Sequence, residues 1–83
     1  MKKLAFKWVE ESARDVRLVN LGQRETEVAR VSRYADGTWQ CYTVNMLTVS
    51  TPMPSKDAAK RQLLHVMNFF LAMVDVEAEV FEQ

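Results

Sequence analysis

The sequence predicts an α+β domain in which an antiparallel β-meander of three to four strands is packed by one long C-terminal α-helix, in the order β-β-β-β-α. Two observations predict this order. Residues 4–44 carry aromatic and β-branched side chains in short runs separated by polar turn residues, which is typical of strands. Residues 63–74, by contrast, are apolar at ten of twelve positions. With 83 residues, of which 48% are hydrophobic, the chain is expected to form a single domain over residues 1–83.

The first strand is predicted over residues 4–9, where Leu4, Phe6 and Trp8 lie at alternate positions. Alternation of large apolar side chains is the period of a strand with one buried face. Residues 4–14 also fit an amphipathic helix, so this alternative stays open. A second short strand is predicted over residues 15–21.

A β-hairpin is predicted where two β-rich runs, residues 27–34 and 38–44, flank a loop that ends at Gly37. A type I turn with a G1 bulge would place Gly37 at positive φ. A two-residue turn would instead pair Tyr34 with Trp39. We favour the bulged turn, and in either register we expect Trp39 to be at least half-buried.

A long helix is predicted after residues 45–54, which are expected to finish the sheet. Two prolines in that segment keep the chain from becoming helical before Ser55, which is a suitable N-cap. The helix is predicted to run from Lys56 at least to Ala72. Residues 74–81 alternate valine or alanine with acids, which is strand period, yet they contain good helix formers and no glycine or proline. We favour continuation of the helix and keep a strand as the alternative.

The sequence contains no catalytic signature. The single histidine, His65, lies on the polar stripe of the predicted helix, without the partners that a metal site or a catalytic triad needs. The single cysteine, Cys41, excludes an intramolecular disulfide, and a small chain without disulfides suits the cytoplasm. The apolar run over residues 63–74 is too short to span a membrane. We therefore expect a cytoplasmic, non-enzymatic protein without cofactor or metal and without a membrane partner.

The start of the predicted helix, Ser55-Lys-Asp-Ala-Ala-Lys60, resembles the start of the last helix of double-stranded-RNA-binding domains. In those domains Ser-Lys-Lys-x-Ala-Lys grips phosphates, whereas here Asp57 stands in place of the middle lysine. The resemblance implies an alternative function, a nucleic-acid-binding domain. Its candidate contact residues are the bases of the helix start and two arginines of the hairpin: Lys56, Lys60, Arg61, Arg30 and Arg33.

A second resemblance covers more of the chain. The segments Trp8-Val-Glu10, Asp15-Val-Arg-Leu-Val19 and Asp36-Gly-Thr-Trp39, together with the helix start, look like those of small phage and prophage accessory proteins with a β-meander and one helix. This resemblance implies a non-catalytic protein that binds and modulates a host or phage machine. Some such proteins inhibit restriction or CRISPR effectors. The leading hypothesis is therefore a protein-binding module that acts by steric blocking.

The predicted helix is apolar around most of its circumference, which is more than one sheet face can cover. Exposed contiguous apolar surface usually marks an interface, and two-fold dimers are the commonest closed assembly. We therefore expect a protein partner and a homodimer in which Phe69, Met73 and Val76 meet their symmetry mates. The predicted partner-binding residues are Phe69, Met73, Val76 and Val80.

Overall fold

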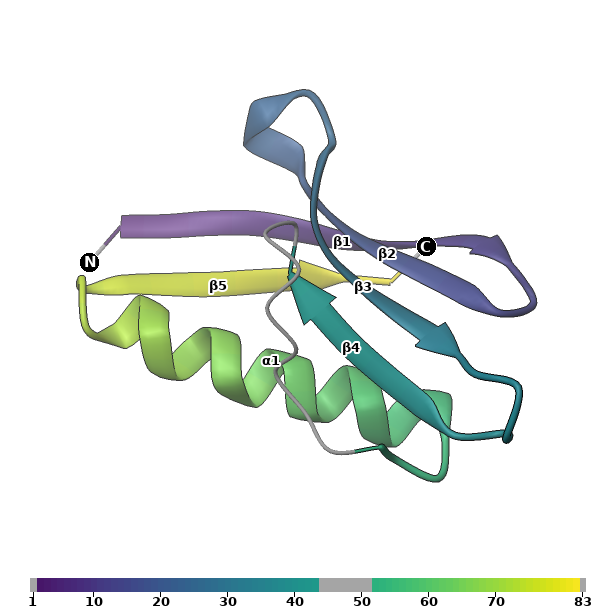
Figure 1. Ribbon diagram of the computed structural model, residues 1–83. Coiled ribbons are helices and arrows are strands. Elements are labelled where there is room, and N and C mark those ends of the chain that lie inside the picture. The colour runs from purple at the N-terminus through teal and green to yellow at the C-terminus, as the bar shows by residue number, and fades with distance from the viewer. Residues whose placement is uncertain (1, 44–51, 83) are drawn as a thin grey trace.

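The computed structural model describes residues 2–43 and 52–82. Within these residues the chain forms a five-stranded sheet with one α-helix along one of its faces (Figure 1). In chain order the elements are β1 (Lys2–Ser12), β2 (Asp15–Asn20), the 3₁₀ turn η1 (Leu21–Gln23), β3 (Thr26–Arg33), β4 (Trp39–Thr43), α1 (Lys56–Ala72) and β5 (Val76–Phe81).

The sheet has the strand order β4-β3-β2-β1-β5 and is mixed. Strands β1 to β4 are antiparallel to their neighbours, whereas β5 runs parallel to β1, with Lys2 opposite Val76 and Phe6 opposite Val80. The predicted α+β class is confirmed, but the prediction of three to four antiparallel strands followed by a terminal helix is wrong. Helix α1 leads the chain from the β4 side of the sheet to the β1 edge, and such a crossover is the connection that a parallel pair requires.

The favoured continuation of the helix through residues 74–81 is also wrong. Helix α1 ends at Ala72, and Asp75 takes a left-handed backbone conformation with φ of 58°, which aspartate tolerates better than most residues. From Val76 onward the chain forms strand β5, in agreement with the alternation of apolar and acidic residues. Ala78 and Val80 pack against the core while the acids between the apolar residues are exposed, and the backbone pairs with β1.

The predicted first strand is confirmed and extends further than expected, so the helical alternative for residues 4–14 is excluded. Strand β1 spans eleven residues and pairs with β2 on one side and β5 on the other. Its inward positions, Phe6 and Trp8, are 4% and 2% exposed. Alternation in this segment therefore reports a strand in the interior of the sheet.

The core lies between the sheet and the N-terminal half of α1. Ser55 caps the helix as predicted, because its hydroxyl oxygen accepts a hydrogen bond from the amide of Ala58 at 3.1 Å. Ala59 and Leu63, one turn apart, are the buried residues of α1, and the small side chain of Ala59 allows a close approach to the sheet. The other buried members of this cluster are Phe6, Trp8, Val16, Leu18, Ala29, Val31 and Cys41.

The hairpin between β3 and β4 has the predicted bulged turn. Arg33, not Tyr34, lies opposite Trp39, and Gly37 has φ of +88°. The amide of Gly37 donates to the Tyr34 carbonyl at 2.9 Å. Trp39 is more than half-buried, as expected. Its backbone also forms an antiparallel bridge with Met53; the rest of the predicted sheet continuation, residues 45–51, lies outside the described residues.

Replacing Gly37 with alanine should lower the free energy of unfolding by roughly 1 kcal/mol, because an L-residue at this φ is strained. A Cβ atom added there would meet nothing within 4 Å, so the loss of stability would come from backbone strain and not from a steric clash. Gly22→Ala is the matched control, since its Cβ would lie 3.4 Å from Asn20 Oδ1 and φ there is not positive. Urea denaturation measures both, and equal losses in the two variants would contradict the assignment of the turn.

Candidate binding surface

Four large apolar side chains at the C-terminal end of α1 and just beyond it are left in solvent. Phe69, Phe70, Met73 and Val74 are 65%, 60%, 71% and 67% exposed, and we call them the helix-end patch. The rings of Phe69 and Phe70 pack edge to face, with centroids 5.7 Å apart and planes at 81°. Single exposed apolar residues are ordinary, but a contiguous group of this size marks an interaction surface.

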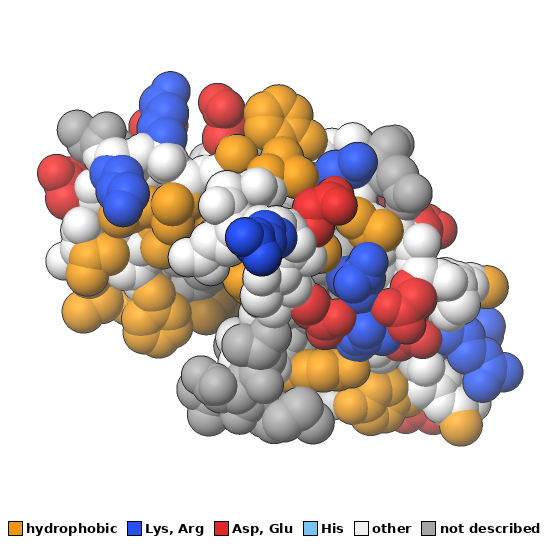
Figure 2. All heavy atoms as spheres, turned by 90° about the horizontal axis from the view of Figure 1, so that it is seen from above, with side chains coloured by type: hydrophobic (Ala, Val, Ile, Leu, Met, Phe, Trp, Pro, Cys, Tyr) orange, Lys and Arg blue, Asp and Glu red, His pale blue; other side chains and the backbone are white. Residues whose placement is uncertain are grey.

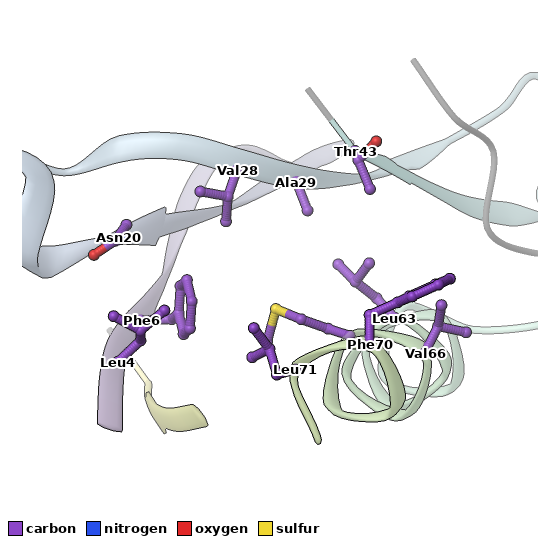
Figure 3. Close-up of a pocket in the computed structure, with 11 residues that line it drawn as sticks. Leu4, Phe6, Asn20, Val28, Ala29, Thr43, Leu63, Val66, Phe70 and Leu71 are labelled. Atoms are coloured by element: carbon purple, nitrogen blue, oxygen red, sulfur yellow. The ribbon is translucent and has the colours of Figure 1, made fainter. Parts of the chain in front are cut away.

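A cavity of about 510 Å³ lies beside this patch, between the C-terminal half of α1 and the sheet (Figure 3). Strands β1 and β3 contribute side chains that include Phe6, Val28 and Ala29, and α1 contributes Val66 and Phe70 among others. Ala59 and Leu63 of α1 are buried against the sheet, whereas Met67 and Leu71 on the later turns are only partly buried and line the cavity. Phe70 lines the cavity and is exposed as well.

The structure brings only two of the four predicted partner-binding residues into the patch. Phe69 on α1 and Met73 just after its end are exposed, whereas Val76 and Val80 are half-buried on β5 and Val80 packs against the core. Helical spacing would place these valines on the helix surface, but the chain leaves the helix before reaching them. The valines therefore do not extend the patch.

Phe70 and Val74 were not predicted as surface residues, because at helical spacing they fall in one apolar row with Leu63. Both lie at the end of that row, where the helix runs away from the part of the sheet that buries Leu63. The feature of the sequence that could have indicated their exposure is the length of the predicted helix, because a long helix extends beyond the short strands that it packs against. Strand β4 has five residues and α1 has seventeen.

Three of the five candidate nucleic-acid contacts are engaged with carboxylates. Lys56 Nζ lies 2.6 Å from Glu10 Oε1, and Lys60 Nζ lies 3.1 Å from Glu82 Oε2. Lys60 Nζ is also 4.9 Å from the centroid of the Trp8 ring. A phosphate group would have to displace these carboxylates. Arg33 and Arg61 are exposed.

The third engaged base, Arg30, is the centre of a charged cluster on the sheet face that α1 does not cover. Its guanidinium donates to both carboxylate oxygens of Glu11 at 3.0 and 2.9 Å and to both of Glu27 at 3.1 and 2.8 Å. Bidentate pairs of this kind are the strong form of the interaction. The hydrogen bonds that Arg30 donates to Glu27 and Glu11 raise its pKa above the usual value. Figure 2 shows acidic and basic side chains interleaved on this face.

The histidine, the cysteine and the carboxylates are the side chains that could bind a metal ion or take part in catalysis. Across residues 2–43 and 52–82, no group of three or more His, Cys, Asp or Glu side chains is placed to hold a metal ion. His65 is exposed on α1, and Cys41 is a buried free thiol. Within the same part of the chain, no helix combines the length and the apolar character needed to cross a membrane.

Comparison with protein-family models, with curated proteins and with solved structures gave no match for this chain. The resemblances to phage accessory proteins and to double-stranded-RNA-binding domains therefore stay predictions.

Replacing Arg30 with methionine should lower the free energy of unfolding by roughly 1–2 kcal/mol. This loss lies between the contribution of an exposed ion pair and that of a hydrogen bond to a charged group. The loss arises because Glu11, Glu27 and the nearby Asp15, 3.6 Å from Arg30, would repel one another. The matched control is Arg33→Met on the same strand, which should change stability by less than about 0.5 kcal/mol. Thermal and urea denaturation compare the two variants, and equal effects would show that the cluster adds nothing.

Acid should weaken the fold through three carboxylates. A hydrogen bond from Lys56 lowers the pKa of Glu10, one from Arg30 lowers the pKa of Glu11, and hydrogen bonds from Thr38 lower the pKa of Asp36. A carboxylate whose pKa is lowered on folding stabilises the folded state at pH values above its unfolded-state pKa, which is 4.5 for the two glutamates. This stabilisation is lost as the pH falls through the folded-state pKa.

The urea midpoint should therefore fall as the pH is lowered from 6 to 3. In Glu11→Gln this fall should be shallower, because one of the titrating groups is gone. A midpoint that stays constant down to pH 3 in the wild-type protein would contradict this assignment.

Proposed function

We propose that this chain is a non-enzymatic protein-binding module that acts by sterically occupying a surface of its partner, as a phage-encoded inhibitor or modulator would. The observation that carries the proposal is the helix-end patch, in which four neighbouring large apolar side chains are 60–71% exposed. Leaving them in water is unfavourable, and a partner that covers them gains the corresponding hydrophobic free energy.

The size of the patch supports a protein partner. At roughly 200 Å² per phenylalanine and somewhat less for methionine and valine, the exposed part amounts to on the order of 450 Å². A standard interface buries about 800 Å² per partner, of which a little over half is apolar, or roughly 450 Å². The patch therefore matches the apolar share of one side of such an interface.

The composition and geometry of the patch favour recognition by packing. Aromatic side chains dominate the energetics of interfaces, and Phe69 and Phe70 already pack against each other. Ordering them on binding therefore costs little conformational entropy. The strongly bonded charges, by contrast, are held in intramolecular pairs on Glu10, Glu11 and Glu27.

The test is affinity capture from the cells that make the protein, followed by titration of the purified partner. Phe69→Asp should raise the dissociation constant at least about 30-fold, because a charge replaces an anchor worth 2 kcal/mol or more. The control is Tyr34→Asp, which changes an equally aromatic side chain that is 45% exposed in the β3–β4 loop, at the far end of the molecule from the end of α1 (Figure 1). Equal losses in both variants would remove the patch from the binding mechanism.

The nucleic-acid alternative predicts retention on heparin or DNA that falls steeply with salt, because phosphate binding releases counterions. We expect weak retention at low salt and none at moderate salt, since Lys56, Lys60 and Arg30 are already paired. Strong, salt-dependent retention that Arg61→Ala and Arg33→Ala reduce would favour the alternative.

A further inference from the structure

Among the described residues, the wall of the cavity beside the helix-end patch is almost entirely apolar, and its two polar side chains are Asn20 and Thr43. The hydroxyl of Thr43 points away from the cavity while its methyl group points inward (Figure 3). Asn20 is 6% exposed, and its Oδ1 accepts a hydrogen bond from the amide of Gly22 at 2.9 Å. Metabolite sites fix their ligand with a few placed polar groups. An apolar side chain of a polypeptide needs no such group, because its backbone is held outside the cavity.

The same surface also presents a side chain suited to the cavity. Phe70 lines the cavity and Phe69 follows on the exposed side, about 100° around the helix at 3.6 residues per turn. An engineered cavity of about 150 Å³ already accepts benzene, so 510 Å³ is ample for a phenyl ring. A cavity and a fitting side chain on one surface are what a two-fold contact needs, because each copy supplies both.

The charge distribution favours a second copy over an unrelated partner. Residues 62–74 of the chain contain no Lys, Arg, Asp or Glu. In a two-fold contact each surface faces its own equivalent, so a charge near the axis would meet a charge of the same sign. A charge-free stretch of thirteen residues avoids this repulsion. The same stretch has no charges to pair with opposite charges on a different protein, although such pairs commonly give an interface its specificity.

We propose that the protein forms a two-fold homodimer in which Phe69 of each copy enters the cavity of the other. The two α1 helices lie side by side and run parallel, with the two-fold axis between them and parallel to both. This arrangement brings the Phe69 side of each helix against the Phe70 side of the other. This proposal rests on one part of the proposed function, namely that the helix-end patch binds a protein, and it names a second copy as the protein that covers the patch. Val76 and Val80, which lie on β5, take no part in the contact.

Sedimentation equilibrium and isotope-filtered NMR on mixed labelled and unlabelled protein test the proposal. We expect a dimer at micromolar concentration, with intermolecular contacts from the Phe69 ring to the methyl groups of Val28 and Ala29. Phe69→Asp should be a folded monomer by circular dichroism, and Tyr34→Asp should remain a dimer. Val28→Trp, which fills the cavity from within, should also be monomeric with the Phe69 ring intact.

Other results overturn the proposal. A dimer that persists in Phe69→Asp, or one whose intermolecular contacts avoid Val28 and Ala29, places the interface elsewhere. A wild-type monomer whose binding to another protein is lost in Phe69→Asp removes the dimer and leaves the proposed function standing. A monomer for which Phe69→Asp changes no binding removes both. A monomer that carries an apolar small molecule in native mass spectrometry assigns the cavity to that ligand.

Discussion

The structure depends on strand β1, which pairs with the strand that follows it and with the last strand of the chain. Its antiparallel partner β2 follows at once, whereas its parallel partner β5 arrives from the far end of the sequence. To bring β5 alongside β1 in the parallel sense, α1 has to cross the sheet from the β4 side. This requirement fixes the path of the helix and the point at which it must end.

The exposed apolar surface follows from that path. Ala59 and Leu63 bring the N-terminal half of α1 into close contact with the sheet, and this half completes the core. The last turns carry the chain to the turn before β5, and there Met67 and Leu71 are only partly buried against the core. The cavity lies between these turns and the sheet, and Phe69 and Met73 lie outside it in solvent. One geometric constraint therefore produces the cavity and the patch together.

The charged residues have a different role. Arg30 holds Glu11 of β1 and Glu27 of its own strand β3, and so connects strands on either side of β2. Lys60 holds Glu82 just after β5 and so connects the helix to the last strand. These pairs connect elements distant in sequence on the outside of the fold. Because these charges are used within the molecule, the proposed recognition of a partner rests on the apolar surface.

The sequence by itself determined the elements whose signals are local. Alternation in β1, the glycine at positive φ in the hairpin and the Ser55 cap each act within a few residues, and each was predictable. Only the tertiary structure determined that residues 76–81 form a strand. Alternating valine and glutamate residues fit a helix or a strand, and pairing with the edge of β1 selects the strand. It also decided that Phe70 is exposed, although the residue shares a helix row with the buried Leu63. Burial along that row depends on the distance between helix and sheet, which no local pattern encodes.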